Sequence, residues 1–275
     1  MSRTHFTADC QGDTLACTLD EAASPVGLLI VSGGNETRAG AFAGQARLAA
    51  RIAEAGYPVL RFDRRGVGDS SGDNLGFTGS APDITAALRA FAAARPGLRR
   101  VVAFGNCDAA SALMLGAGSG CDGLVLANPW TFEGETADDA SAMPAEAIRA
   151  RYAARLKDPR EWLRLVSGGV DLRKLARGLQ GALSKPAAPS SLAEDMRKGL
   201  SRFAGPARIL LAMRDRTAQA FATVWDQSDP RLHRREGADH AFSARADSDW
   251  LFSQLIAALD EQALFNKQTG QLDVD

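Results

Sequence analysis

Residues 101–111 read VVAFGNCDAAS, and this stretch decides the fold. Its apolar start is typical of a buried β-strand, and the small residues after Asp108 predict a helix that leaves the strand at once. A turn this tight lifts the side chain at its apex, Cys107, above the edge of the sheet. The motif GNCDA at 105–109 resembles the nucleophile turn G-x-S-x-G, with cysteine in place of serine and Ala109 in place of the second glycine.

The composition limits the class of protein. The chain has 275 residues, a formal net charge of -1 and 45% hydrophobic residues, which suit one α/β domain or a core domain with an inserted cap. This balance does not favour nucleic acid as a partner. No apolar run approaches the roughly 20 residues that span a bilayer, and the N-terminus lacks the apolar core of a signal peptide. We therefore expect a cytoplasmic protein with no membrane span, whose four cysteines are reduced thiols.

Motifs for metals and nucleotides are missing from the sequence. There is no C-x-x-C pair, and the three histidines are scattered along the chain. The glycine-rich turns match neither a P-loop nor G-x-G-x-x-G. We therefore expect no metal and no cofactor.

Short apolar runs with strand character alternate with segments of helical spacing. The sequence predicts strands at about 4–10, 15–20, 27–31, 57–62, 101–104, 123–127, 207–213 and 231–235. Such alternation favours a largely parallel sheet with helices on both faces. Functional residues of such sheets lie beyond the carboxyl ends of the strands.

Residues 131–204 contain no strand-like run and predict helices separated by prolines. We expect them to form a helical lid inserted after the sixth strand, between core segments 1–130 and 205–275. Four aromatic residues are predicted to line a substrate pocket under this lid: Trp130, Phe132, Tyr152 and Trp162. Five arginines between residues 149 and 164 either form a solvated helix face or hold an anionic substrate handle such as phosphopantetheine.

Three side chains follow predicted strands in the order nucleophile, acid, base: Cys107, Asp215 and His240. A thiol is mostly protonated at neutral pH, so it needs an imidazole to accept its proton. The imidazole needs a carboxylate on its other nitrogen to fix its tautomer. The rival histidines, His5 and His233, lie within strands, and Asp239 adjoins His240 too closely in sequence to orient it.

The oxyanion formed during such chemistry needs two N–H donors. We expect one from the backbone of Asp108 and the other from Gly34 or Asn35, which follow a strand in the sequence SGGNETR. The loop RFDRRGVGDS resembles the D-x-R-G-x-G-x-S loop common in α/β-hydrolases, and this resemblance implies that Asp63 and Arg65 brace these turns. Ser80 and Asp83 predict a capping box at the start of the next helix.

These motifs together resemble the α/β-hydrolase superfamily over residues 26–260. The GG loop with a following arginine, the strand AGYPVLRFD, the turn RGVGDS and the elbow GNCDA are most similar to the type-1 hydrolases associated with the exosortase A system of bacteria. The resemblance implies an α/β-hydrolase fold, with a mostly parallel eight-stranded sheet flanked by helices.

Two classes of function fit these residues. In the first, an acyl-cysteine enzyme cleaves or transfers the acyl group of an ester or thioester, either a free small molecule or one carried on CoA or a carrier protein. Water as the acceptor makes it a hydrolase; an amine, alcohol or thiol makes it an acyltransferase. In the second, the chain is a non-catalytic α/β-hydrolase homologue that binds a small ligand. Nothing in the sequence indicates the oligomeric state.

Overall fold

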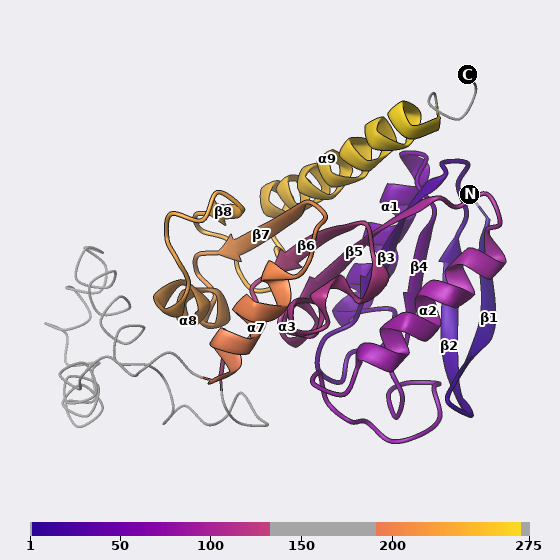
Figure 1. The fold of residues 1–275 in the computed structure, drawn as a ribbon, viewed down its shortest axis with the longest axis horizontal. Coiled ribbons are helices and arrows are strands. Elements are labelled where there is room, and N and C mark those ends of the chain that lie inside the picture. Colours follow the sequence, from indigo (N-terminus) through magenta and orange to yellow (C-terminus); the bar gives the residue numbers. More distant parts are fainter. Residues whose placement is uncertain (1, 133–190, 271–275) are drawn as a thin grey trace, which may run out of the picture.

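The computed structural model describes residues 2–132 and 191–270, with side chains as far as residue 265. An eight-stranded sheet forms the centre of this part of the chain (Figure 1). Its strands are β1 (Arg3–Cys10), β2 (Asp13–Asp20), β3 (Val26–Val31), β4 (Val59–Phe62), β5 (Arg100–Asn106), β6 (Gly123–Ala127), β7 (Ala207–Ala212) and β8 (Leu232–Arg235). The α/β-hydrolase fold predicted from the sequence is confirmed.

The strand order is β1-β2-β4-β3-β5-β6-β7-β8. β2 pairs antiparallel with β1 and β4, and every other pair is parallel. The central strands are buried on both faces, so successive residues alternate between two cores. Leu29 and Val31 of β3 face one core, and Leu28 and Ile30 face the other. This is why β3 has a continuous apolar sequence.

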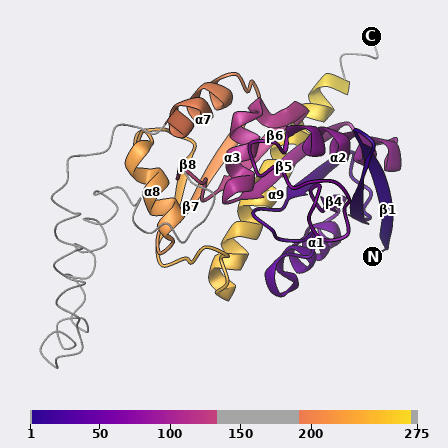
Figure 2. The same ribbon diagram turned by 90° about the horizontal axis from the view of Figure 1, so that it is seen from below.

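Helices cover both faces of the sheet (Figure 2). The helices are α1 (Gly44–Glu54), α2 (Ala81–Ala94), α3 (Asp108–Leu115), α7 (Ser191–Ser201), α8 (Arg216–Val224) and α9 (Arg245–Gly270), with short 3-10 turns at Ala41–Ala43 and Ala117–Gly120. Residues of α1 and α9 pack into one core, and residues of α2, α3, α7 and α8 pack into the other. None of the helices described is both long and apolar enough to cross a bilayer.

The capping box predicted at the start of α2 is wrong. The Ser80 side chain makes no capping bond; its hydroxyl donates to Gly76 O at 2.8 Å and accepts from Arg64 at 3.0 Å. Asp83 accepts from the Arg65 N–H at 3.0 Å and from its Nε at 2.6 Å. Ser80 and Asp83 therefore bond to Arg64 and Arg65 of the RFDRRGVGDS loop instead of capping their own helix. These bonds connect that loop to α2.

Most of the predicted lid lies outside the described residues, including Tyr152 and Trp162. The described end of that segment is α7. Gly199 brings α7 close to α3, because a Cβ at this position would lie 2.1 Å from Met114 O. Met196 and Leu200 are buried in the same core as α3, so α7 is packed on the sheet domain.

Candidate active site

Cys107 lies between β5 and α3 in a backbone conformation rare for a residue with a side chain. Its φ is 62° and its ψ is -127°, and its N–H donates to Ala127 O of β6 at 2.9 Å. This turn leaves the thiol partly exposed at the carboxyl end of the sheet. The three other cysteines, Cys10, Cys17 and Cys121, are buried. Burial raises the pKa of their thiols to about 11, 11 and 12 respectively.

The glycine that this turn requires is Gly105. A Cβ there would lie 2.7 Å from the carbonyl carbon of Ala109 and 2.8 Å from the N of Ala110. The backbone of α3 therefore packs directly on β5 at Gly105. Ala109 itself is fully buried in the core beneath α3, so its methyl group has room where the usual motif has a second glycine.

His240 joins Asp215 and Cys107. Its Nδ1 lies 2.9 Å from Asp215 Oδ2, and its side chain also forms a hydrogen bond with that of Cys107, which leaves Nε2 for the thiol. Asp215 precedes α8 and accepts the Ala218 N–H at 3.1 Å as an N-cap, so its carboxylate is held by the helix it begins. The His240 side chain is 42% exposed and that of Asp215 is 10% exposed.

These contacts favour the charged form of His240. The hydrogen bond to Asp215 is the largest cause, followed by the bond to Cys107, and together they outweigh burial and raise the pKa of His240 to about 10. Because its pKa is raised, the His240 imidazole binds a proton from the thiol tightly. The arrangement can therefore deprotonate Cys107 and return the proton to a leaving group.

Two asparagines that sequence reasoning missed hold the His240 loop. Asn106 Nδ2 and Asn128 Nδ2 donate to the carbonyl of His240 at 3.1 and 3.2 Å. Asn128 also donates to Asn106 Oδ1 at 2.9 Å and accepts the Ala212 N–H at 2.8 Å. Asn128 is buried and directly follows β6, so a polar residue at the carboxyl end of a parallel strand was the available signal.

The predicted oxyanion donors lie beside the thiol, at the start of α3 and in the loop after β3. The Asp108 N–H makes no hydrogen bond with the described residues. The Gly34 N–H is engaged: it donates to Asp108 Oδ1 at 2.7 Å. The Asn35 N–H also has no partner among the described residues, while its side chain accepts from Asn74 at 2.9 Å.

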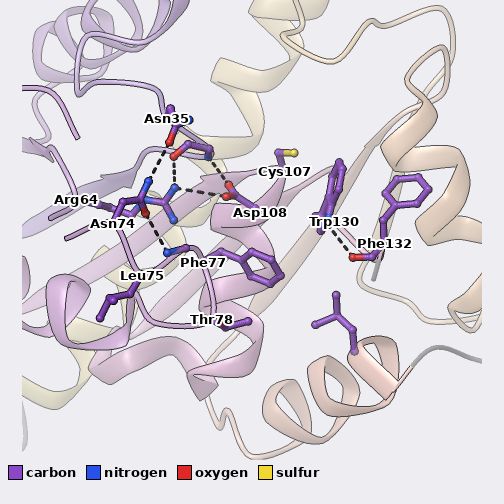
Figure 3. Close-up of a pocket in the computed structure, with 13 residues that line it drawn as sticks. Asn35, Arg64, Asn74, Leu75, Phe77, Thr78, Cys107, Asp108, Trp130 and Phe132 are labelled. Atoms are coloured by element: carbon purple, nitrogen blue, oxygen red, sulfur yellow. Dashed lines mark hydrogen bonds and ion pairs between the residues drawn. The ribbon is translucent and has the colours of Figure 1, made fainter. Parts of the chain in front are cut away.

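A cavity of about 800 Å³ opens beside Cys107 and Asp108 (Figure 3). Trp130 and Phe132 lie on one side of it, and the loop that carries Phe77 lies on the other. The two aromatic rings pack edge to face with centroids 4.7 Å apart, and Trp130 Nε1 donates to Phe132 O at 3.0 Å. Both described members of the predicted pocket set therefore line this cavity.

Arg64 is a further pocket residue that the sequence did not single out. It lines the cavity, although its side chain is only 3% exposed, and its Nη2 lies 3.4 Å from Asp108 Oδ2. It lies between Asp63 and Arg65 in the RFDRRGVGDS loop, and the only signal in the sequence was a charged residue after a strand. Its neighbours in that loop have other contacts: Asp63 binds Arg38, and Arg65 binds Asp83.

The alternative residues lie in other surroundings. His5 pairs with Thr18 within the β1–β2 hairpin, at 2.9 Å, and His233 lies in β8. Asp239 accepts hydrogen bonds from Ser243 in its own loop. Within residues 2–132 and 191–270, no three His, Cys, Asp or Glu side chains gather as metal ligands would.

Known structures share this architecture at low sequence identity. An esterase from Pyrococcus furiosus is 15% identical, with a TM-score of 0.59 over 94% of this chain and 91% of the esterase. A serine hydrolase without a lid from Xanthomonas campestris is 16% identical, with a TM-score of 0.57 over 95% of each chain. Proline iminopeptidase from Mycobacterium smegmatis is 15% identical, with a TM-score of 0.57 over 96% of this chain and all (100%) of the peptidase.

Among curated proteins, no sequence matches this chain significantly. The sequence profile of the alpha/beta hydrolase family does match, over residues 28–253. That range contains all the strands from β4 to β8, the elbow at Cys107 and the loops of Asp215 and His240. The chain therefore belongs to the alpha/beta hydrolase family.

Proposed function

We propose that the protein is an acyl-cysteine enzyme that acts on esters or thioesters. The observation that carries the proposal is the position of His240, hydrogen-bonded on one side to Asp215 and on the other to Cys107. A partly exposed thiol, an imidazole and a largely buried carboxylate are together the parts that nucleophilic acyl transfer requires.

In the first half of the reaction, the Cys107 proton first passes to His240 Nε2, and the Cys107 thiolate beside the imidazolium then attacks the carbonyl carbon. The new C–S bond leaves a tetrahedral oxyanion, which backbone N–H groups stabilise. The oxyanion then collapses and the bond to the leaving group breaks, with the leaving group taking the proton from His240. In the second half, His240 accepts a proton from the attacking acceptor, the C–S bond breaks and the thiol regains its proton.

The aromatic side of the cavity suits an apolar acyl group. Trp130, Phe132 and Phe77 offer ring faces and edges, and about 800 Å³ exceeds the volume of a small acyl chain. The acceptor is water in a hydrolase and an amine, alcohol or thiol in an acyltransferase. Free esters and acyl groups carried on CoA or a carrier protein are both within this proposal.

The test is intact-protein mass after incubation with p-nitrophenyl esters and with acyl-CoA. We expect one acyl adduct that is absent from Cys107→Ala, because the other three cysteines are buried. Cys121→Ala is the matched control and should still form the adduct. Added amines, alcohols or thiols that shorten the life of the adduct and appear acylated indicate a transferase. A folded wild-type protein that forms no adduct and turns over no acyl donor contradicts the proposal and favours a ligand-binding homologue.

A further inference from the structure

Asp108 carries a carboxylate that the chemistry above does not use. Oδ1 accepts the Gly34 N–H at 2.7 Å, and Oδ2 lies 3.4 Å from Arg64 Nη2. The two side chains are 14% and 3% exposed, so the pair is largely removed from water. It connects the residue after the nucleophile with the loop after β3, across 74 positions of sequence.

Arg64 binds the other polar group of Gly34, the carbonyl oxygen, which belongs to the same peptide unit as the Asn35 N–H. Its Nη2 donates to the carbonyl oxygen of Gly34, and its Nη1 donates to Ser80 Oγ at 3.0 Å. The Ser80 hydroxyl in turn donates to Gly76 O at 2.8 Å. Both polar groups of Gly34 are therefore bound to charged side chains, and Ser80 anchors the other terminal nitrogen of Arg64.

The loop is shaped to admit this carboxylate. A Cβ on Gly33 would lie 2.7 Å from Asp108 Oδ1 and 2.8 Å from Asn106 O, so any larger residue would displace the Asp108 side chain. Gly34 has a φ of 54°, a left-handed conformation that glycine adopts at little cost. The two glycines thus let one side chain reach the backbone of the loop.

We propose that Asp108 is a positioning residue for the oxyanion hole. Asp108 fixes the peptide before Gly34 and Arg64 fixes the peptide after it, so that the N–H of Asn35 serves as the second donor beside the N–H of Asp108. A Gly34 N–H in a charge-assisted bond of 2.7 Å is committed to the carboxylate. The Asn35 N–H has no partner among the described residues, and the Asn35 side chain is itself held by Asn74. This inference rests on the proposed acyl-cysteine function.

Two reactions of Cys107 distinguish an effect of Asp108 on the oxyanion hole from an effect on the thiol itself or on the whole fold. Acylation by a p-nitrophenyl ester passes through an oxyanion, whereas alkylation by iodoacetamide displaces iodide at a CH2 carbon and forms none. We expect Asp108→Ala to slow acylation by about 10²-fold, the effect of misplacing a group by about 1 Å, with most of the loss in kcat. Alkylation should proceed at the wild-type rate.

The matched variants are Asp108→Asn and Asp73→Ala. Asparagine keeps an oxygen that accepts the Gly34 N–H, so it should recover much of the acylation rate. Asp73 is an exposed carboxylate next to Asn74 of the pocket, and its removal should change neither reaction. Amide hydrogen exchange of residues 32–36 reports on the loop without any reaction; it should be faster in Asp108→Ala and close to wild type in Asp108→Asn.

The outcomes are distinct. Slower acylation with unchanged alkylation and faster exchange supports the inference. Acylation that is equal or faster in Asp108→Ala overturns it, because the carboxylate then only obstructs the hole. If the wild-type protein forms no acyl adduct, the proposed function fails on its own. The exchange measurement then tests the positioning role of Asp108 separately: unchanged amide exchange of residues 32–36 in Asp108→Ala overturns that role.

Discussion

Cys107 has a φ of 62° with a ψ of -127°, a combination that L-residues rarely adopt. Such a conformation costs about 1–3 kcal/mol and persists where the surrounding structure enforces it. Here β5, the Cys107 N–H bond to Ala127 O and the start of α3 provide the enforcement. The thiol gains access to the pocket at the expense of folding stability, which is why strain at this residue points to a functional position.

The strain predicts that glycine is more stabilising than alanine at Cys107, which is the reverse of the usual order of these two residues in a helix. Cys107→Gly should have a higher free energy of unfolding than Cys107→Ala, by about 1 kcal/mol or more, because glycine adopts a positive φ without a steric penalty. Urea unfolding measures the difference. At Ala112, inside α3, the change to glycine should instead destabilise by about 1 kcal/mol. A Cys107→Ala variant as stable as Cys107→Gly would show that the turn is relaxed.

At the scale of elements, the elbow depends on how closely α3 approaches β5. The carbonyl carbon of Ala109 lies 2.7 Å from where a Gly105 Cβ would be, so helix and strand are in backbone contact. The notable feature of the sequence was the missing second glycine at Ala109, whereas in the structure it is Gly105 that has no room for a side chain. The methyl group of Ala109 points into the core.

Gly105→Ala should therefore shift α3 and disturb both Cys107 and the Asp108 N–H. Overpacking of this kind costs about 1–3 kcal/mol, and the backbone atoms at the contact cannot rotate away as a side chain can. We expect a lower midpoint of thermal unfolding and a large loss of acylation rate. Gly97→Ala is the control, since its Cβ would meet nothing within 4 Å. A Gly105→Ala protein with wild-type stability and rate would contradict the backbone contact.

The elements themselves were largely predictable, because burial on two faces produces the apolar runs of β3, β5 and β6. Cys107, Asp215 and His240 could be singled out from the sequence in the same way, because each follows a predicted strand. The residues that contact them could not be predicted in this way. Arg64 and Asn128 act through contacts between loops of different strands, and no periodicity records such contacts. Ser80 and Asp83 matched a local capping pattern that long-range bonds to the RFDRRGVGDS loop replace.

On the scale of the whole molecule, the sheet order brings distant parts of the chain to one edge. β5, β6 and β7 are neighbours in the sheet, so their carboxyl ends place Cys107, Asn128 and Asp215 side by side. His240 follows β8 and is held by both Asp215 and the two asparagines. The raised pKa of His240 therefore exists only in the folded chain, so the free energy of unfolding depends on whether His240 carries a proton.

That coupling predicts how stability depends on pH. The pKa of His240 rises from 6.5 to about 10 on folding, chiefly through Asp215, so the folded chain binds this proton more strongly than the unfolded chain. The stabilisation is complete below pH 6.5, weakens as pH rises and is lost above about 10. The free energy of unfolding of wild type minus that of His240→Gln should accordingly fall between pH 6 and pH 10 in urea titrations.

His233→Gln is the control for that experiment, because burial lowers the pKa of His233 and reverses the sign. A partly buried histidine with a lowered pKa destabilises the fold only where the unfolded chain takes up a proton, below about pH 6.5. The difference between wild type and His233→Gln should thus stay flat from pH 7 to pH 10 and become less favourable towards pH 5. If the His240 difference were equally flat above pH 7, the bond to Asp215 would not hold a proton on the imidazole, and His240 would meet the thiol as a neutral base.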